Sequence, residues 1–156
     1  MYNNFFGFSE KPFDVTPDPQ FLYLNSAYQE ILAALLYGIQ ERRGFIALIG
    51  EAGTGKTTLL NTVMQRLPPS NKVGFIFNST LTFKQMLMFA LIDLEVVKSQ
   101  RNLSISEAIH CLNQFALKQL KKSGNVVLII DEAQNLKHNS LENLRLLSNL
   151  ETHKYK

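Results

Sequence analysis

The chain has 156 residues, of which 46% are hydrophobic and 19% are charged, so it is long and apolar enough to bury a core and is not a disordered tail. Its net charge of +3 permits nucleic acid or an anionic surface as a partner without requiring either. There is neither a signal peptide nor an apolar stretch of roughly 20 residues, so we expect a cytoplasmic domain with no membrane span within this chain.

The first 24 residues are rich in aromatic residues and prolines. The prolines exclude a long regular element, and we expect an ordered arm whose rings pack onto the domain. Ser26 and Gln29 then predict a capping box at the start of an amphipathic helix that ends near residues 42–44. Arg42 and Arg43 either complement the dipole of this helix or contact a ligand or a neighbouring subunit.

Residues 50–57 fit the pattern G-x-x-x-x-G-K-[ST] at every fixed position. The apolar run at residues 45–49 predicts a buried parallel strand before them, and helical spacing predicts a helix after them, as far as Pro68. At such a turn, glycines let the backbone approach an anion, and the first helix amides favour it. We therefore predict a nucleotide site formed by Gly50, Glu51, Ala52, Gly53, Thr54, Gly55, Lys56, Thr57 and Thr58.

Two side chains of this loop carry specific predictions. Lys56 is expected to reach the β- and γ-phosphates and to take part in catalysis, and the Thr57 hydroxyl is expected to bind Mg²⁺. The alternative is a glycine-rich turn without a ligand, which the flanking strand and helix patterns disfavour. With a nucleotide in the loop, the aromatic arm has a second possible role as a lid over the adenine base.

The next elements are a predicted buried strand at residues 73–77 and two helices that begin with capping boxes. Thr82 with Gln85 opens the first helix, and Ser104 with Glu107 opens the second. We assign the apolar faces of both helices to the core.

The second of these helices carries other chemically notable residues. Cys111 lies where a helix places apolar residues, so we expect a small buried thiol. Lysines gather near the helix end, where they form a solvated face or, alternatively, contact nucleic acid; they are Lys118, Lys121 and Lys122. The histidines have no metal-site spacing, and we assign them no chemistry.

Residues 126–130 form an apolar, mostly β-branched run that predicts a strand buried on both faces, and Asp131 and Glu132 follow it directly. Open parallel sheets bind ligands at this end of their strands. Asp131 is expected to bind Mg²⁺ together with Thr57, and Glu132 is expected to be the catalytic residue that positions or deprotonates a water. A charged strand end without chemistry is the alternative, and the loop at residues 50–57 disfavours it.

The last predicted helix begins at a cap formed by Asn139 and Glu142. Arg145 on this helix is expected to be a surface residue, with action on a neighbouring subunit's phosphate as the alternative.

With these residues in view, the sequence resembles the general secretion pathway protein A family of ATPases, also called ExeA-type, within the AAA+ superfamily. The phosphate-binding motifs indicate only a broad class of NTPases, and the flanking strings make the narrower match. Those strings follow the order of the family along nearly the whole chain, at residues 5–8, 11–13, 16–19, 36–39, 42–45, 50–57, 130–136 and 144–152.

This resemblance implies an α/β P-loop NTPase of the AAA+ type, a three-layer sandwich with a parallel sheet. Residues 1–156 would be the N-terminal part of a single domain, with residues 1–24 as the arm and residues 25–156 as the core. The resemblance further implies ATP and Mg²⁺ as ligands and Glu132 as the catalytic acid. The implied partners are further subunits of the same chain or components of an envelope secretion or pilus assembly system.

The chain departs from the family where it stops before the expected sensor strand, arginine finger and helical lid. We therefore expect a truncated domain that is marginally stable and hydrolyses ATP slowly. Two other functions remain open. A DNA-associated ATPase, similar to transposition helpers, would use Arg42, Arg43 and the lysines at residues 118–122, whereas a nucleotide-binding scaffold would show no significant hydrolysis.

Overall fold

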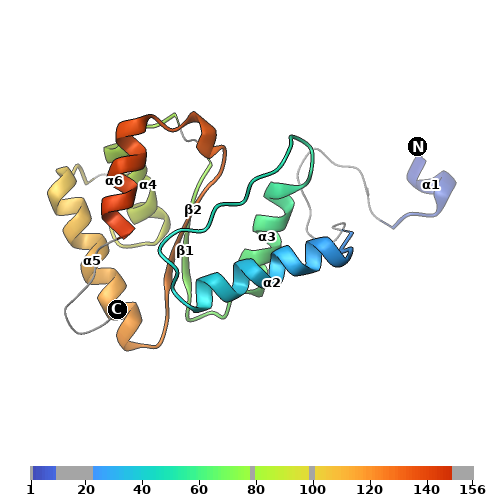
Figure 1. The fold of residues 1–156 in the computed structure, drawn as a ribbon, viewed down its shortest axis with the longest axis horizontal. Coiled ribbons are helices and arrows are strands. Elements are labelled where there is room, and N and C mark those ends of the chain that lie inside the picture. The colour runs from blue at the N-terminus through green and yellow to red at the C-terminus, as the bar shows by residue number, and fades with distance from the viewer. Residues whose placement is uncertain (1, 10–22, 78–79, 99–100, 149–156) are drawn as a thin grey trace. The chain divides into compact units, whose positions relative to one another are not determined.

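A computed structural model of the chain describes residues 2–9, 23–77, 80–98 and 101–148 (Figure 1). Helices alternate with two parallel strands, which confirms the predicted α/β class. In chain order the elements are α1 (Tyr2–Phe6), α2 (Ser26–Gln40), α3 (Lys56–Arg66), β1 (Lys72–Ile76), α4 (Phe83–Asp93), α5 (Ile105–Lys121), β2 (Val126–Ile130), the short 3-10 helix η2 (Ala133–Asn135) and α6 (His138–Ser148).

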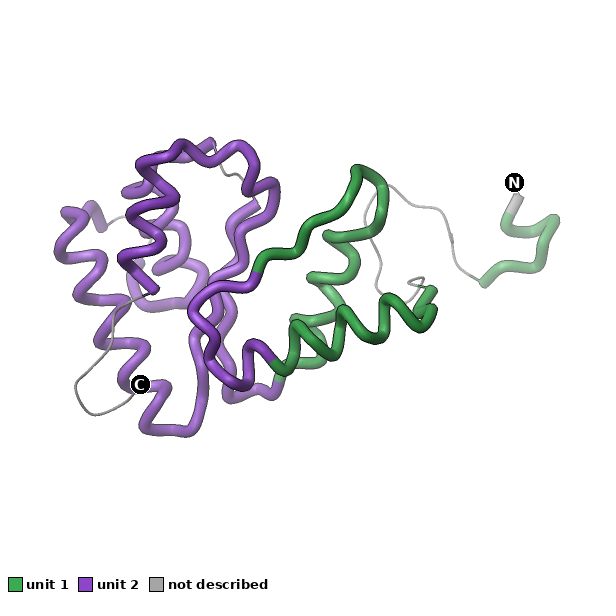
Figure 2. The backbone as a smooth tube through the Cα atoms, viewed as in Figure 1, with its two compact units in different colours: residues 1–37, 47–67 green, residues 38–46, 68–156 purple. Residues whose placement is uncertain are grey.

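The chain forms two compact units (Figure 2). Unit 1 comprises residues 1–37 and 47–67, and unit 2 comprises residues 38–46 and 68–156. The motif at residues 50–57 therefore belongs to unit 1, whereas Asp131 and Glu132 belong to unit 2.

Unit 2 is built on the parallel pair of β1 and β2, in a register that places Lys72 opposite Val126 and Ile76 opposite Ile130. Helix α4 packs against β1 and also contacts α5 and α6. Its apolar side chains dominate the core because they recur at helical spacing on the side that faces the other elements. The buried members of this core are Ile76, Phe83, Met86, Leu87, Ala90, Leu91, Leu94, Val97, Leu103, Ala108, Leu112 and Leu144.

Both strands of unit 2 were predicted, but β1 differs from the prediction in its bounds and β2 differs in its burial. β1 begins and ends one residue earlier than the predicted residues 73–77. β2 occupies the predicted residues 126–130, but only Ile129 is buried and its other side chains are half-buried. The prediction of burial on both faces is therefore wrong for the described residues.

The strand predicted at residues 45–49 is not formed. Phe45 is 60% exposed and Ile49 is 90% exposed, and among the described residues the only ladder joins β1 to β2. A strand is held by hydrogen bonds to a neighbouring strand, so apolar, β-prone residues without such a neighbour do not form one. This run instead leads to the loop without regular secondary structure.

In unit 1, α2 and α3 supply the buried side chains Leu32, Leu35, Leu59 and Val63. Helix α3 follows the loop and ends just before Pro68, as predicted. The predicted Ser26 and Gln29 box is wrong, because the Asn25 side chain accepts from the Tyr28 amide at 2.9 Å. Asn is as good a helix cap as Ser, and here it stands one residue earlier.

The arm is described only in part. Residues 2–6 form the short helix α1, and Phe5 and Phe6 are 82% and 63% exposed. The prediction that the rings of this segment pack onto the domain is therefore wrong for these residues. The aromatic residues at positions 13 and 21 lie outside the described residues.

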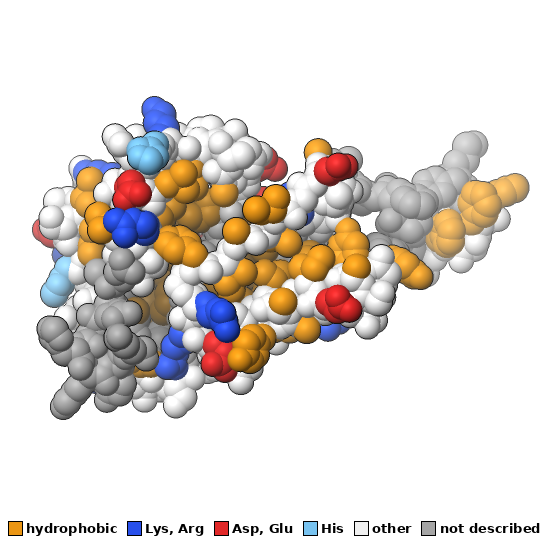
Figure 3. All heavy atoms as spheres, viewed as in Figure 1, with side chains coloured by type: hydrophobic (Ala, Val, Ile, Leu, Met, Phe, Trp, Pro, Cys, Tyr) orange, Lys and Arg blue, Asp and Glu red, His pale blue; other side chains and the backbone are white. Residues whose placement is uncertain are grey.

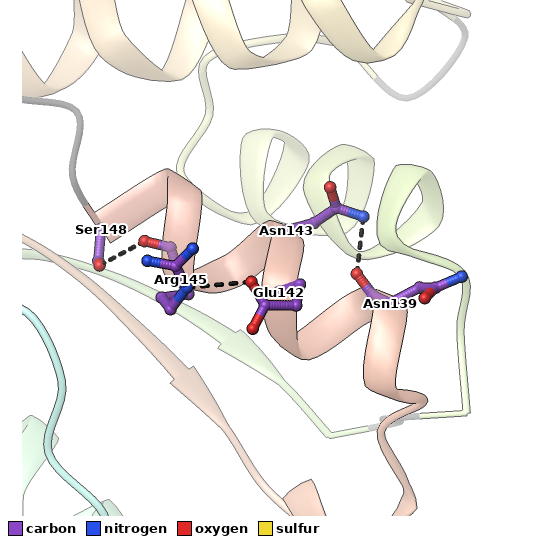
Figure 4. A network of polar contacts seen from close by, with 5 residues as sticks. All are labelled: Asn139, Glu142, Asn143, Arg145 and Ser148. Atoms are coloured by element: carbon purple, nitrogen blue, oxygen red, sulfur yellow. Dashed lines mark hydrogen bonds and ion pairs between the residues drawn. The ribbon is translucent and has the colours of Figure 1, made fainter.

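Two of the other predicted caps are present as reciprocal boxes, at Thr82 with Gln85 and at Ser104 with Glu107. The cap predicted at Asn139 is wrong, because α6 begins at His138 and the Asn139 carbonyl accepts from the Asn143 side chain at 2.8 Å within the helix (Figure 4). Cys111 is half-buried rather than buried. In the described part of the chain, no helix has both the length and the hydrophobicity needed to cross a bilayer.

Candidate nucleotide-binding site

The loop at residues 50–57 has the backbone conformation that its glycines permit. Gly53 and Gly55 adopt positive φ angles of 79° and 76°, in a region that other residues rarely enter. Gly55 is the N-cap of α3 and provides no side-chain hydrogen bond to the helix amides. The start of α3 is therefore capped by backbone alone, as suits a helix terminus that receives an anion.

The Lys56 ammonium group lies over the start of the loop. Its Nζ donates to the carbonyl oxygens of Gly50 at 2.9 Å and Glu51 at 2.7 Å. The Thr54 hydroxyl donates to the same Glu51 carbonyl at 2.8 Å and so braces the loop from within. An ammonium group has three donors, so these two carbonyls hold Lys56 in place while its remaining donor suits a phosphate oxygen.

Exposure changes along the loop in the way a surface ligand site requires. The loop is exposed from Gly50 to Thr54, and residues 55–58 are half-buried at the start of α3. Thr57 and Thr58 lie in the first turn of that helix, and the Thr58 carbonyl accepts from the Thr62 hydroxyl at 2.9 Å. All the residues predicted to bind nucleotide, from Gly50 to Thr58, thus lie together on one loop and one helix turn of unit 1.

The predicted acidic pair lies directly after β2. The Asp131 amide donates to the Ile76 carbonyl at 2.9 Å, which extends the parallel ladder by one bond. The Asp131 carboxylate accepts from the Glu132 amide at 2.9 Å, and Glu132 has a positive φ of 53°. This turn projects two successive acids from one strand end of unit 2.

Gln134 is a contact of this acidic pair that the sequence reading missed. Its side-chain amide donates to the Glu132 carboxylate. In the sequence, Gln134 follows Glu132 by two positions, and this spacing was the available signal. The one-turn helix η2 brings the two side chains together. Gln134 therefore helps to orient the carboxylate for which catalysis was predicted.

Arg42 and Arg145, for which contact with a ligand or a neighbouring subunit was an alternative, both form contacts within unit 2. The Arg42 guanidinium donates to the Gly124 carbonyl at 3.5 Å within unit 2. Arg145 pairs with Glu142 at 3.0 Å on the surface of α6 (Figure 4). This pair agrees with the expected surface role of Arg145.

The lysines predicted near the end of α5 complement its dipole, since Lys118 and Lys121 lie in its last turn. On the face drawn in Figure 3, the cations of the described residues are interspersed with acidic side chains. No group of His, Cys, Asp and Glu residues in the described part of the chain has the arrangement of a metal cluster.

The residues present fit a triphosphate and a hard cation. Left-handed glycines, a backbone-capped helix start and a lysine held on loop carbonyls match an anion with several oxygens. A hydroxyl and a carboxylate are the oxygen ligands that Mg²⁺ prefers, and the two residues predicted to bind it, Thr57 in unit 1 and Asp131 in unit 2, carry these groups.

Two comparisons relate the chain to known proteins. Residues 39–156 match the AAA domain family. Over 152 residues, the chain is also 39% identical to general secretion pathway protein A of Aeromonas hydrophila. This match covers 97% of the present chain and 28% of that protein. The chain thus spans less than a third of the length of this relative, and no solved structure matches it significantly. The chain therefore belongs to the AAA domain family, with the α/β fold class of a P-loop NTPase.

Proposed function

We propose that the chain binds ATP with Mg²⁺ through residues 50–58 and hydrolyses the γ-phosphate bond. The observation that carries this proposal is the geometry of the loop, in which Lys56 is held on the Gly50 and Glu51 carbonyls beside the start of α3. A glycine-rich turn without a ligand would not require a lysine at this position. Membership of the AAA family supports ATP as the nucleotide.

Each site residue has a distinct role in this proposal. The amides at residues 53–57 and the Lys56 ammonium neutralise the phosphate chain, and Thr57 and Asp131 provide oxygen ligands for the metal. When bound, Mg²⁺ neutralises charge on the phosphate oxygens. Glu132, oriented by Gln134, accepts a proton from the attacking water.

The biological process is proposed from the relative. Because that relative is named general secretion pathway protein A, we propose that this ATPase serves the assembly of an envelope secretion or pilus system. It would act with further copies of itself or with components of that system, on the cytoplasmic side. DNA-stimulated turnover with salt-sensitive DNA binding would instead favour the DNA-associated alternative.

The first test is ATP-Mg²⁺ binding by calorimetry to the wild-type chain and to Lys56→Ala. Removing a charged donor from the phosphate site should raise the Kd for ATP by at least about tenfold. Lys98→Ala is a matched control, because Lys98 is an exposed lysine of unit 2. The affinity of this variant for ATP should equal that of the wild type. Equal affinity of Lys56→Ala and the wild type would refute the proposed site.

The second test separates hydrolysis from binding. Glu132→Gln keeps the shape of the side chain but removes its basicity, so turnover should fall by about 100-fold or more while the Kd for ATP stays within about twofold. Phosphate release and calorimetry on the same samples measure both quantities. An unchanged turnover rate would exclude Glu132 as the catalytic residue and favour the scaffold alternative.

A further inference from the structure

A side chain outside the glycine-rich motif contacts the loop. Tyr28, in the first turn of α2, donates its hydroxyl to the carbonyl oxygen of Thr54, 26 residues further along the chain. Both residues belong to unit 1. The pattern G-x-x-x-x-G-K-[ST] does not include this tyrosine. Its contact with the loop therefore adds a group to the site that the motif alone does not identify.

The bond acts on a specific peptide plane. The Thr54 carbonyl and the Gly55 amide belong to the same peptide unit, and the described residues contain no cis peptide bond. In a trans peptide the C=O and N–H bonds point in opposite directions. A donor that holds the Thr54 carbonyl therefore also directs the Gly55 amide, away from Tyr28.

This orientation matters because phosphate loops work by pointing successive amides toward one side. The carbonyls of the same peptide units then face the opposite side, where a hydrogen-bond donor stabilises the arrangement. Gly55 adopts a φ of 76°, and as a glycine it has many other conformations available. The peptide plane before it would rotate at little cost without a partner for its carbonyl.

Tyr28 is well placed to be that partner because it is itself anchored. Its backbone amide donates to the Asn25 side chain at 2.9 Å, which closes the first turn of α2. Further along the same helix, Leu32 and Leu35 are buried. The tyrosine hydroxyl also lies 3.8 Å from the position that a Cβ on Gly55 would occupy, so it stands beside this glycine.

We propose that Tyr28 is a positioning residue of the phosphate loop, which selects the conformation in which the Gly55 amide is directed toward the phosphate chain. This inference rests on the proposed function and deepens it. It assigns to α2 a role in binding the phosphate chain of the nucleotide rather than its base. Tyr28 therefore contributes to affinity for any ligand that carries this chain, with or without adenine.

The test compares Tyr28→Phe, which removes only the hydroxyl, with the wild type. Binding of ATP-Mg²⁺ is measured by calorimetry, and binding of inorganic tripolyphosphate with Mg²⁺ is measured by competition. Loss of one ordering hydrogen bond should raise both dissociation constants by a similar factor, about three- to tenfold. In the ligand-free chain, NMR should show a shifted or exchange-broadened Gly55 amide resonance in Tyr28→Phe.

Tyr23→Phe is the matched control, because Tyr23 is a tyrosine of the same unit that is 84% exposed. It should match the wild type for both ligands and for the Gly55 resonance. If the wild type binds ATP, and Tyr28→Phe binds both ATP and tripolyphosphate as tightly as the wild type does, the positioning role is wrong and the proposed function stands. Weaker binding of ATP with unchanged binding of tripolyphosphate would place Tyr28 at the base and also overturn the inference. Failure of the wild type to bind either ligand would overturn the proposed function and, with it, this role of Tyr28.

Discussion

At the scale of single residues, Glu107 shows how one side chain holds a helix start. Its carboxylate accepts from the Ser104 hydroxyl at 2.7 Å and from the Ser104 amide at 2.8 Å. Both hydrogen bonds lower the pKa of the Glu107 carboxyl, and the bond from the Ser104 hydroxyl has the larger effect. The charges of Arg101 and Lys84 add a smaller effect in the same direction. The box stabilises the ionised form and so couples the start of α5 to pH.

The sign of this coupling follows from the lowered pKa. The contribution of Glu107 to stability is fully present above the pKa of the unfolded chain and is lost as the pH falls through the lower pKa of the folded chain. Carbon-detected NMR titration of the Glu107 carboxyl should therefore give a midpoint below that of an unstructured peptide. Ser104→Ala should move the midpoint back up.

Thr82→Ala is the control for this titration, because it removes the equivalent cap of α4, whose partner is Gln85 rather than Glu107. It should leave the Glu107 midpoint where it is in the wild type. A midpoint that does not respond to Ser104→Ala would contradict the hydrogen-bonded origin of the shift.

Predictions of single contacts from the sequence succeeded where only one nearby residue could act as the helix cap. The boxes at Thr82 and Ser104 could be predicted because donor and acceptor lie three residues apart on the same turn. At α2, Asn25 and Ser26 are neighbouring cap residues of similar quality, so the pattern did not decide between them.

At the scale of elements, α4 closes one edge of the sheet. Residues 72 and 76 of β1 bond toward β2, so the amide of Phe75 points to the opposite edge. There it donates to the Asp93 carboxylate at 2.7 Å. An acid at the end of a helix is unfavourable for the helix dipole, and this hydrogen bond to the strand edge offsets that cost.

Asp93→Ala should therefore destabilise unit 2 by about 1 kcal/mol, because the bond is exposed and water partly replaces it. Urea unfolding measures the free energy, and hydrogen exchange should show faster exchange of the Phe75 amide. Glu142→Ala is a matched control in an exposed ion pair on α6, and its effect should be about 0.5 kcal/mol or less. Protection of the Phe75 amide that survives Asp93→Ala would argue against the edge contact.

At the scale of the whole molecule, large hydrophobic side chains remain on the surface of the described residues. Phe77 is 67% exposed and Phe89 is 45% exposed, and their rings form an edge-to-face pair with centroids 6.3 Å apart. With Ile76 and Leu81 they line a shallow apolar hollow of unit 2. Surfaces of this kind favour association because contact removes apolar area from water.

We therefore expect the average mass of the purified chain to rise with concentration in light scattering. Phe77→Ser should reduce this rise, whereas Tyr23→Ser should not, because Tyr23 is an exposed aromatic residue of unit 1 that does not line this hollow. A constant monomer mass over the whole concentration range would show that the exposed rings do not drive association.

The sequence by itself determined the α/β class, the loop of residues 50–57, the helix after it and the acids after β2. These features rest on patterns in which interacting groups are close along the chain, such as helical spacing and glycines at fixed offsets. The roles of Lys56, Thr57, Asp131 and Glu132 remain proposals that the variants above test.

Only the tertiary structure decided which apolar runs become strands and which distant side chains meet. Residues 45–49 are as strand-like as residues 126–130, but only the second run has a strand beside it in the described residues. The contacts of Tyr28 with Thr54 and of Asp93 with Phe75 join residues 26 and 18 positions apart. No local pattern encodes such contacts, because they depend on how helices pack against loops and strands.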